Sequence, residues 1–182
     1  FGISDRFCDK RITHVVTDSL IAREIMPEKI IPIKQKGPTK FIDLGANGVI
    51  IITSPLSENG NSKYKNQEIE ILNKLICANK NLNFYIRQHY RESKEKYNEL
   101  YKYKNCCSLN ESIDIPLSDI EIKGYNAIGF HSSALNSPGL IVTNKYTLSG
   151  LVDSKHSLAV VPSLAKKYEV LSDYNLTIPS SN

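Results

Sequence analysis

The feature that most constrains the fold is a run of four β-branched residues, Val49-Ile50-Ile51-Ile52. β-branched side chains favour an extended backbone, and an unbroken apolar run is typical of a strand that is buried on both faces. Strands of that kind belong to parallel sheets, whose two faces are covered by other elements. The run therefore predicts a central strand of an α/β protein.

The segment after this run completes a strand–helix–strand unit. A helix over residues 64–80 would place apolar side chains on one face, namely Ile69, Leu72, Leu75 and Ile76. The chain then enters an apolar, aromatic-rich run from Leu82 to Ile86, which is typical of a buried strand. We expect a βαβ unit with the right-handed crossover that such units adopt.

Further strand and helix signals continue this alternation along the chain. Strands are predicted at 12–17, 30–33, 106–109, 125–130 and 140–143, a short helix within 113–120, and longer helical segments at 93–103 and 157–170. The pattern predicts an α/β fold with a Rossmann-like, mainly parallel sheet flanked by helices. A Gly-Pro pair at 37–38 marks a turn. We interpret residues 1–40 as a linker or the end of a preceding domain and residues 41–182 as a ligand-binding domain.

The composition of the 182 residues, 41% hydrophobic and 23% charged, is typical of a soluble globular protein. No apolar run reaches the roughly 18 residues that a membrane span needs. Phe1 is not a start Met and no leader pattern follows it, so we expect the chain to be the later part of a longer protein. A net charge of +4 suits an anionic ligand or a membrane surface, and nucleic acid is not expected as a partner.

The four cysteines do not form a metal-binding or disulfide pattern. They are Cys8, Cys77, Cys106 and Cys107. None of them is spaced as in a Cys-x-x-Cys motif, and two are adjacent. We therefore expect reduced thiols in a cytoplasmic protein, without a zinc site or any other bound metal.

Polar loops follow three of the predicted strands. They are Ser57-Glu58-Asn59-Gly60, His89-Tyr90-Arg91-Glu92 and His131-Ser132-Ser133. The carboxyl ends of parallel strands share one edge of a sheet, where ligands bind in open α/β folds. A His, an Arg and a serine pair at such an edge favour a phosphate-binding site. The simpler interpretation is a set of solvated loops, with an Asn-Gly turn and a serine that caps a following helix.

The order of these motifs resembles that of the bacterial sialyltransferases of glycosyltransferase family 52, which are related to the bacterial polysialyltransferases. That family carries a His-Pro motif after a strand, then an Ile-Pro-x-Glu segment, then a Ser-Ser motif after another strand. The matching stretches are His89-Tyr90-Arg91-Glu92, Ile115-Pro116-Leu117-Ser118 and Gly129-Phe130-His131-Ser132-Ser133. The resemblance covers roughly Val49 to Leu135.

The resemblance implies that the chain is the C-terminal, donor-binding half of a two-domain GT-B glycosyltransferase. Such an enzyme transfers sialic acid from CMP-sialic acid to a galactose-terminated lipooligosaccharide or capsular glycan. His89 would contact the CMP phosphate and protonate it as it leaves, and Glu58 would be the catalytic carboxylate. The donor would also be bound by Arg91, Ser118, Asp119, Phe130, Ser132 and Ser133.

Three positions depart from the family pattern. Tyr90 stands where proline is usual, and Ser118 stands where a nucleotide-binding glutamate is expected, with Asp119 beside it. The acidic-acidic-Gly signature that supplies the general base is matched only by Glu58-Asn59-Gly60, or else lies upstream of Phe1. The alternatives are therefore a transferase that uses another nucleotide sugar and a truncated, non-catalytic remnant that binds a donor.

The expected partners are a nucleotide-sugar donor and a glycan acceptor. The expected location is cytoplasmic. Peripheral association with the inner face of the cytoplasmic membrane and formation of a homodimer are both left open.

Overall fold

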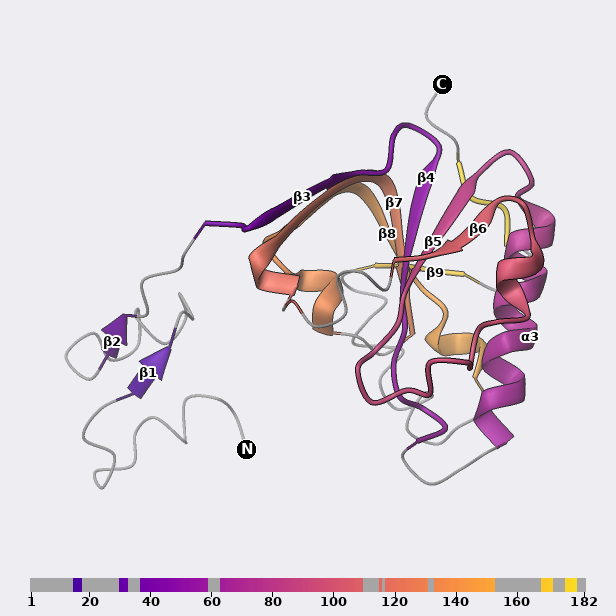
Figure 1. The fold of residues 1–182 in the computed structure, drawn as a ribbon, viewed down its shortest axis with the longest axis horizontal. Helices are drawn as coiled ribbons and strands as arrows, with labels where there is room; N and C mark the ends of the chain where they lie inside the picture. Colours follow the sequence, from indigo (N-terminus) through magenta and orange to yellow (C-terminus); the bar gives the residue numbers. More distant parts are fainter. Residues whose placement is uncertain are drawn as a thin grey trace. The chain divides into compact units, whose positions relative to one another are not determined.

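The chain consists of two units, residues 1–37 and 38–182. The computed structural model describes residues 15–17, 30–32, 37–58, 63–109, 115, 117–130, 133–152, 168–171 and 176–179. In the first unit, strands β1 (Val15–Thr17) and β2 (Ile30–Pro32) pair in parallel (Figure 1). Both lie in segments where the sequence predicts strands, and that prediction is confirmed.

The second unit is built on a seven-stranded sheet (Figure 1). Its strands are β3 (Lys40–Asp43), β4 (Gly48–Ile52), β5 (Asn83–Arg87), β6 (Cys106–Ser108), β7 (Ile120–Gly129), β8 (Leu140–Thr147) and β9 (Glu169–Val170). Each pair of neighbouring strands in it is parallel. The predicted α/β architecture with a parallel sheet is confirmed.

The strand order changes direction at β4. The order is β6-β5-β4-β7-β8-β9, with β3 also paired to β7. The chain moves outward from β4 through β5 to β6 and then returns to pair β7 with the other side of β4. Because these strands are parallel, the C-terminal ends of β4, β5 and β7 lie on one edge of the sheet.

The strands β3 and β4 pair with successive halves of the same long strand, β7. The first half of β7, residues 120–123, pairs with β3, and the second half, residues 126–129, pairs with β4. The loop between β3 and β4 turns at Gly45, whose φ of 70° is in the left-handed region that glycine adopts most easily. The Gly45 N–H donates to Asp43 Oδ1 at 2.8 Å. The loop therefore separates two strands that run in the same direction and pair, one after the other, with β7.

Burial of β4 follows its β-branched run. All five residues of this strand are buried. Alternate side chains enter two separate hydrophobic cores, one on each face of the sheet, since successive side chains of a strand point to opposite faces. Ile50, Ile86 and Ile128, which lie in segments predicted to be strands, are fully buried in β4, β5 and β7.

Helix α3 (Lys63–Ala78) covers the first of these cores, beside β5 and β6 in Figure 1. Its buried apolar residues are Ile71, Leu72, Leu75 and Ile76. After the helix, the Asn79 side chain donates to the carbonyls of Leu75 and Leu176, each at 2.7 Å, and accepts the Ile178 N–H at 2.8 Å. The predicted helix is confirmed. Among the described residues, no helix combines the length and apolar character of a membrane span.

The segment from 93 to 103 is not the helix that the sequence predicts. It forms successive tight turns, in which the N–H groups of Lys96, Leu100 and Tyr103 donate to carbonyls three residues earlier. Only a short 3-10 helix, η2 (Leu100–Lys102), forms at its end. The adjacent residues Lys96 and Tyr97 are both buried, and the tight turns allow both side chains to point inward.

A helix does follow the serine pair at 132–133, as the simpler interpretation of the sequence has it, but it is short. The structure has a four-residue 3-10 helix, η5 (Ser133–Asn136). Leu140 pairs with Ile122, so the connection from Gly129, at the end of β7, to Leu140 has to span roughly 20 Å. A single α-helix over this whole connection would span only about 15 Å and could not make it.

Two short elements, η4 and β9, lie in segments where the sequence predicts helices. The predicted short helix within 113–120 is present as the 3-10 helix η4 (Leu117–Asp119). Residues 169–170, at the end of a segment predicted to be helical, instead form β9 beside β8. Pairing with a neighbouring strand decides the conformation there, because local propensity is weak for so short an element. The rest of that segment, residues 157–167, lies outside the described residues.

We predict that Gly139→Ala destabilises the protein by about 1–3 kcal/mol, the range for overpacking a core. A Cβ atom at this position would lie 2.0 Å from the Ile120 carbonyl oxygen and 2.9 Å from that of Leu117, so backbone would have to move. Urea unfolding measures the change. The control is Gly150→Ala, whose Cβ would meet its nearest neighbour at an ordinary 3.5 Å. Equal stabilities for the two variants would contradict this packing.

Candidate functional site

Two polar loops meet at the edge where β4 and β5 end. Ile52, the last residue of β4, pairs with Arg87, the last residue of β5. Thr53 follows β4 directly, and its hydroxyl accepts the backbone N–H of His89 at 2.9 Å. The structure therefore brings the loop after β4 and the loop after β5 together, as their positions at strand ends predict.

The third loop is described only where it leaves β7. Phe130 is fully buried in the first core, so its ring packs against protein. Its carbonyl oxygen accepts the hydroxyl of Thr147 at 2.9 Å and also that of Ser149, which fixes the start of the loop. Residues 131–132 and the side chain of Ser133 lie outside the described residues, so their predicted contact with a donor stays a prediction.

The backbone of His89 is held in a closed turn. Its N–H is shared between Thr53 Oγ1 and Glu92 Oε2, each at 2.9 Å. Its carbonyl accepts the N–H of Glu92, also at 2.9 Å. The Thr53 hydroxyl in turn donates to the Glu92 carboxylate. The turn from 89 to 92 is thus bonded to the end of β4 as well as to itself.

The imidazole of His89 has a defined orientation. Its Nδ1 atom accepts the backbone N–H of Arg91 at 3.2 Å, so the proton of the neutral ring lies on Nε2. Partial burial is the main cause that lowers the pKa of His89 below its usual value; the charge of Glu92 opposes this effect and that of Arg91 adds to it. At neutral pH His89 is therefore a neutral ring that offers Nε2–H as a hydrogen-bond donor.

Tyr90 and Arg91 extend the site toward solvent. The Tyr90 ring is 74% exposed and stacks on the His89 ring, with centroids 4.4 Å apart. The Arg91 guanidinium lies 6.0 Å from the centre of the Tyr90 ring. Position 90 therefore carries an aromatic ring that stacks on the histidine.

Behind the His89 turn lies a buried charged group, which we call the Lys96 cluster: Glu68, Glu92, Lys96 and Tyr97. Lys96 Nζ lies 2.7 Å from Glu68 Oε2 and 2.6 Å from Glu92 Oε1. The Tyr97 hydroxyl contacts Glu68 Oε1 and Glu92 Oε1, each at 2.8 Å. The cluster joins helix α3, which carries Glu68, to the loop that carries His89.

One ammonium faces two buried carboxyl groups in the Lys96 cluster. Burial, opposed by Lys96 and assisted by Glu92, raises the pKa of Glu68 to about 7. Burial alone would lower the pKa of Lys96, but Glu68 and Glu92 outweigh it and the pKa is raised. Burial also raises the pKa of Tyr97 well above its usual value. A proton on Glu68 therefore balances the charge of the cluster up to about neutral pH.

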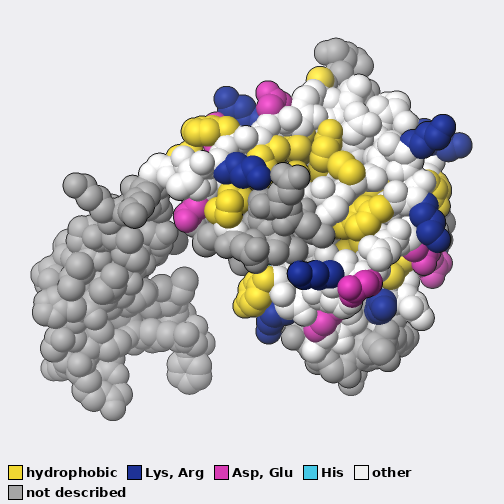
Figure 2. Space-filling view, in the orientation of Figure 1, with side chains coloured by type: hydrophobic (Ala, Val, Ile, Leu, Met, Phe, Trp, Pro, Cys, Tyr) yellow, Lys and Arg dark blue, Asp and Glu magenta, His cyan; other side chains and the backbone are white. Residues whose placement is uncertain are grey.

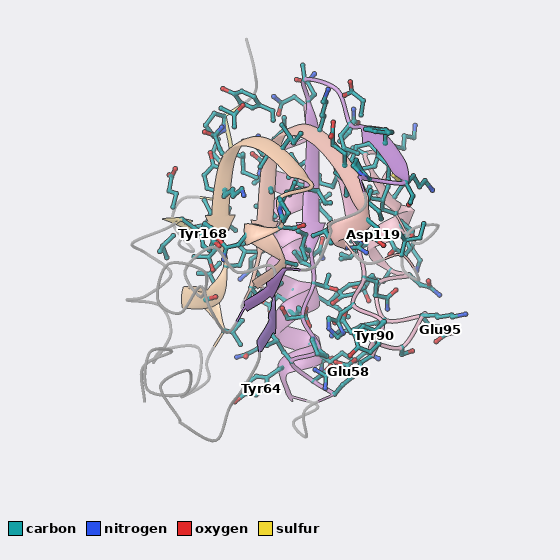
Figure 3. All side chains as sticks on the ribbon, turned by 90° about the vertical axis from the view of Figure 1, so that its left-hand side faces the viewer. Glu58, Tyr64, Tyr90, Glu95, Asp119 and Tyr168 are labelled. Atoms are coloured by element: carbon teal, nitrogen blue, oxygen red, sulfur yellow. The ribbon has the colours of Figure 1, made fainter. Side chains whose placement is uncertain are left out.

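Glu58, the predicted catalytic carboxylate, lies at the rim of this cluster. Its Oε2 atom accepts the Ser57 hydroxyl at 2.9 Å and Lys96 Nζ at 3.3 Å. Burial acts to raise the pKa of Glu58, but Ser57, the backbone and Lys96 outweigh it, and the pKa is lowered. Glu58 is ionised at neutral pH, near His89 but paired to Lys96. Figure 3 shows Glu58 and Tyr90 at the same end of the unit.

Asp119 is not brought to this end of the sheet. It closes η4 immediately before β7, and its carbonyl accepts the N–H of Thr39 at 2.8 Å. Figure 3 shows it well above Glu58 and Tyr90. Ser118 belongs to the same short helix, and its side chain lies outside the described residues. The predicted roles of Ser118 and Asp119 in donor binding therefore gain no support from their position.

Two features of the site were missed from the sequence. The first is Arg87, which is half-buried beside the site. Its Nη2 atom donates to the Ile115 carbonyl at 2.6 Å and so holds Ile115 at the end of β5. The second is the Lys96 cluster. A signal for Glu68 was present, because it precedes Ile71, Leu72 and Leu75 by three, four and seven residues and so falls on the buried face of the helix.

On the face shown in Figure 2, the Lys and Arg side chains of the described residues are scattered and form no continuous basic stripe. Within the described part of the chain, no group of three or more His, Cys, Asp or Glu side chains is placed to hold a metal ion.

Comparison of the chain with protein-family models, curated proteins and solved structures finds no significant match.

We predict that Lys96→Met destabilises the protein by about 3–5 kcal/mol at pH 7, the usual loss when one partner of a buried ion pair is removed. The variant would leave two buried carboxyl groups without their cation. Chemical unfolding measures the loss. Lys94→Met, at an exposed position two residues away, is the control and should change stability by less than about 0.5 kcal/mol. A similarly small change for Lys96→Met would mean that the cluster contributes little.

We predict a pH dependence of stability that Glu68→Gln removes. The pKa of Glu68 rises from 4.5 to about 7 on folding, so between these pH values the folded chain keeps a proton that the unfolded chain has lost. Stability from this group therefore falls as the pH rises through that window. Relative to wild type, Glu68→Gln should gain about 3 kcal/mol from pH 4.5 to above pH 7. Parallel unfolding curves against pH for the two proteins would contradict the buried proton.

Proposed function

We propose that residues 38–182 form the donor-binding half of a GT-B glycosyltransferase that acts on a nucleotide sugar, with CMP-sialic acid as the donor that the motifs favour. The observation that carries the proposal is the His89 ring. It stands at the C-terminal end of a parallel strand, with Nδ1 occupied by the Arg91 N–H at 3.2 Å and Nε2–H left as the donor for a phosphate oxygen. The motif resemblance supplies the sugar and the acceptor.

The strand order supports this choice. Counted along the chain from β4, the order β6-β5-β4-β7-β8-β9 corresponds to 3-2-1-4-5-6, the order of Rossmann-like nucleotide-binding sheets. Ligands of such sheets bind beyond the strand C-termini, near the point where the order reverses. Here that point lies between β4 and β7, and His89 follows β5, the neighbour of β4 on the other side.

The proposed chemistry uses His89 first as a hydrogen-bond donor. When the bond between the sugar and the phosphate oxygen breaks, negative charge grows on that oxygen, and a preplaced N–H group stabilises it. The bound phosphate also raises the pKa of His89, because an adjacent negative charge favours the protonated ring. His89 would then take up a proton at Nδ1, which gives up the contact with the Arg91 N–H, and transfer its Nε2 proton to the leaving CMP. Glu58 would accept the proton of the acceptor hydroxyl, which attacks the sugar carbon.

A second candidate function is nucleotide binding without transfer. One observation favours it: the Glu58 carboxylate is paired to Lys96 at 3.3 Å and its pKa is lowered, which makes it a weak base. The two functions differ in a transfer assay with the complete protein. A panel of CMP-, UDP- and GDP-sugars with a galactose-terminated acceptor tests both the donor and the reaction. Binding of CMP without transfer of any sugar would favour the second function.

We predict that His89→Ala lowers turnover of the complete protein by about 10²–10⁴-fold, the usual contribution of general acid catalysis. It should also raise the inhibition constant of CMP, since a phosphate contact is lost. His89→Gln keeps an N–H donor without a transferable proton, so it should retain more CMP affinity than turnover. Lys94→Met is the surface control. A folded His89→Ala variant with unchanged transfer and unchanged inhibition by CMP would refute the role of His89.

A further inference from the structure

The Glu92 carboxylate differs from the other groups of the Lys96 cluster in its hydrogen bonds. Its Oε2 atom accepts the His89 N–H at 2.9 Å and the Thr53 hydroxyl. Its Oε1 atom accepts Lys96 Nζ at 2.6 Å and the Tyr97 hydroxyl at 2.8 Å. Only 7% of Glu92 is exposed. One carboxylate therefore receives four donors and joins the ends of β4 and β5 to the buried cation.

We propose that Glu92 is the positioning residue of His89, and that with Thr53 it selects the ring orientation in which Nε2–H faces the ligand. The orientation depends on the turn: the N–H of Arg91, two residues after His89, meets Nδ1 only while the turn from 89 to 92 stays closed. Glu92 closes it twice, through its own N–H to the His89 carbonyl and through its carboxylate to the His89 N–H. That the ring meets a phosphate rests on the proposed function.

Both oxygen atoms of the Glu92 carboxylate accept hydrogen bonds, Oε1 from Lys96 and Oε2 from the His89 N–H. Lys96 is a donor only and cannot accept a hydrogen bond. In Glu92→Gln the amide oxygen must therefore turn toward Lys96, and the amide nitrogen then faces the His89 N–H, donor against donor. The variant keeps the size of the side chain and its hydrogen bond from Lys96. It replaces the hydrogen bond from the His89 N–H, which holds the turn, with a repulsive contact.

The chain supplies matched controls. Glu68 contacts Lys96 and Tyr97 but not His89, so Glu68→Gln alters the same buried cluster without touching the turn. Thr53→Val removes the hydroxyl at nearly constant shape, and Thr53→Ser restores it. A role in stability alone would be common to Glu68 and Glu92. A positioning role belongs to Glu92 and to the Thr53 hydroxyl.

The test is nitrogen NMR of the histidine rings in the 182-residue chain, which distinguishes Nε2–H from Nδ1–H rings, together with CMP titration of the same samples. We expect His89 to be mainly the Nε2–H form in wild type, Glu68→Gln and Thr53→Ser. In Glu92→Gln and Thr53→Val it should be a mixture of both forms. CMP affinity should fall about tenfold or more in these two variants, as expected for one lost hydrogen bond to a charged group.

Each result decides the proposal. A wild-type ring without preference for Nε2–H overturns it, as does an unchanged ring in Glu92→Gln and Thr53→Val. An equal change in Glu68→Gln would also overturn it, because the effect would then be a general one. If Glu92→Gln does not fold, the two Thr53 variants decide alone. If the ring changes as expected but CMP does not bind even to wild type, the positioning role stands and the proposed function fails.

Discussion

The burial of Lys96 between Glu68 and Glu92 is the interaction on which the arrangement of this site depends. Each of the three residues is at most 7% exposed, and a buried charge is tolerated only when it is paired and hydrogen-bonded. The ion pairs join helix α3 to the loop after β5. Glu92 also accepts a hydrogen bond from Thr53, which joins this loop to the end of β4. The loop after β5 could therefore not move away from helix α3 without leaving a buried charge unpaired.

The sheet and the cluster have separate roles. The parallel pairing of β4, β5 and β7 brings three strand ends to one edge, but it does not orient the side chains beyond that edge. The hydrogen bonds of Thr53 and Glu92 orient the His89 turn, and the Arg91 N–H orients the ring. A ligand that binds there meets a donor group that is already placed, which reduces the reorganisation that binding requires.

Much of the fold could be predicted because its signals are local. The β-branched run at 49–52, the helical spacing after it and the apolar run at 82–86 were enough to predict β4, α3 and β5, and Ile50 and Ile86 are buried in these strands. The wrong predictions fall where the connection to distant residues decides. Residues 93–103 form turns around the buried Lys96 and Tyr97, and residues 169–170, predicted to be helical, pair with β8 instead.

The candidate site divides in the same way. By itself, the sequence determined that His89 follows a buried strand and that Glu58 follows its neighbour, since strand alternation and strand ends are properties of short segments. Only the tertiary structure decided that Glu92 and Lys96 are buried partners and that Asp119 lies away from Glu58 and Tyr90. Charged residues are ordinarily exposed, so composition alone predicts that the charged side chains at 91–96 are solvated. Burial becomes favourable only once Glu68, from a helix more than twenty residues earlier, supplies the second carboxyl group.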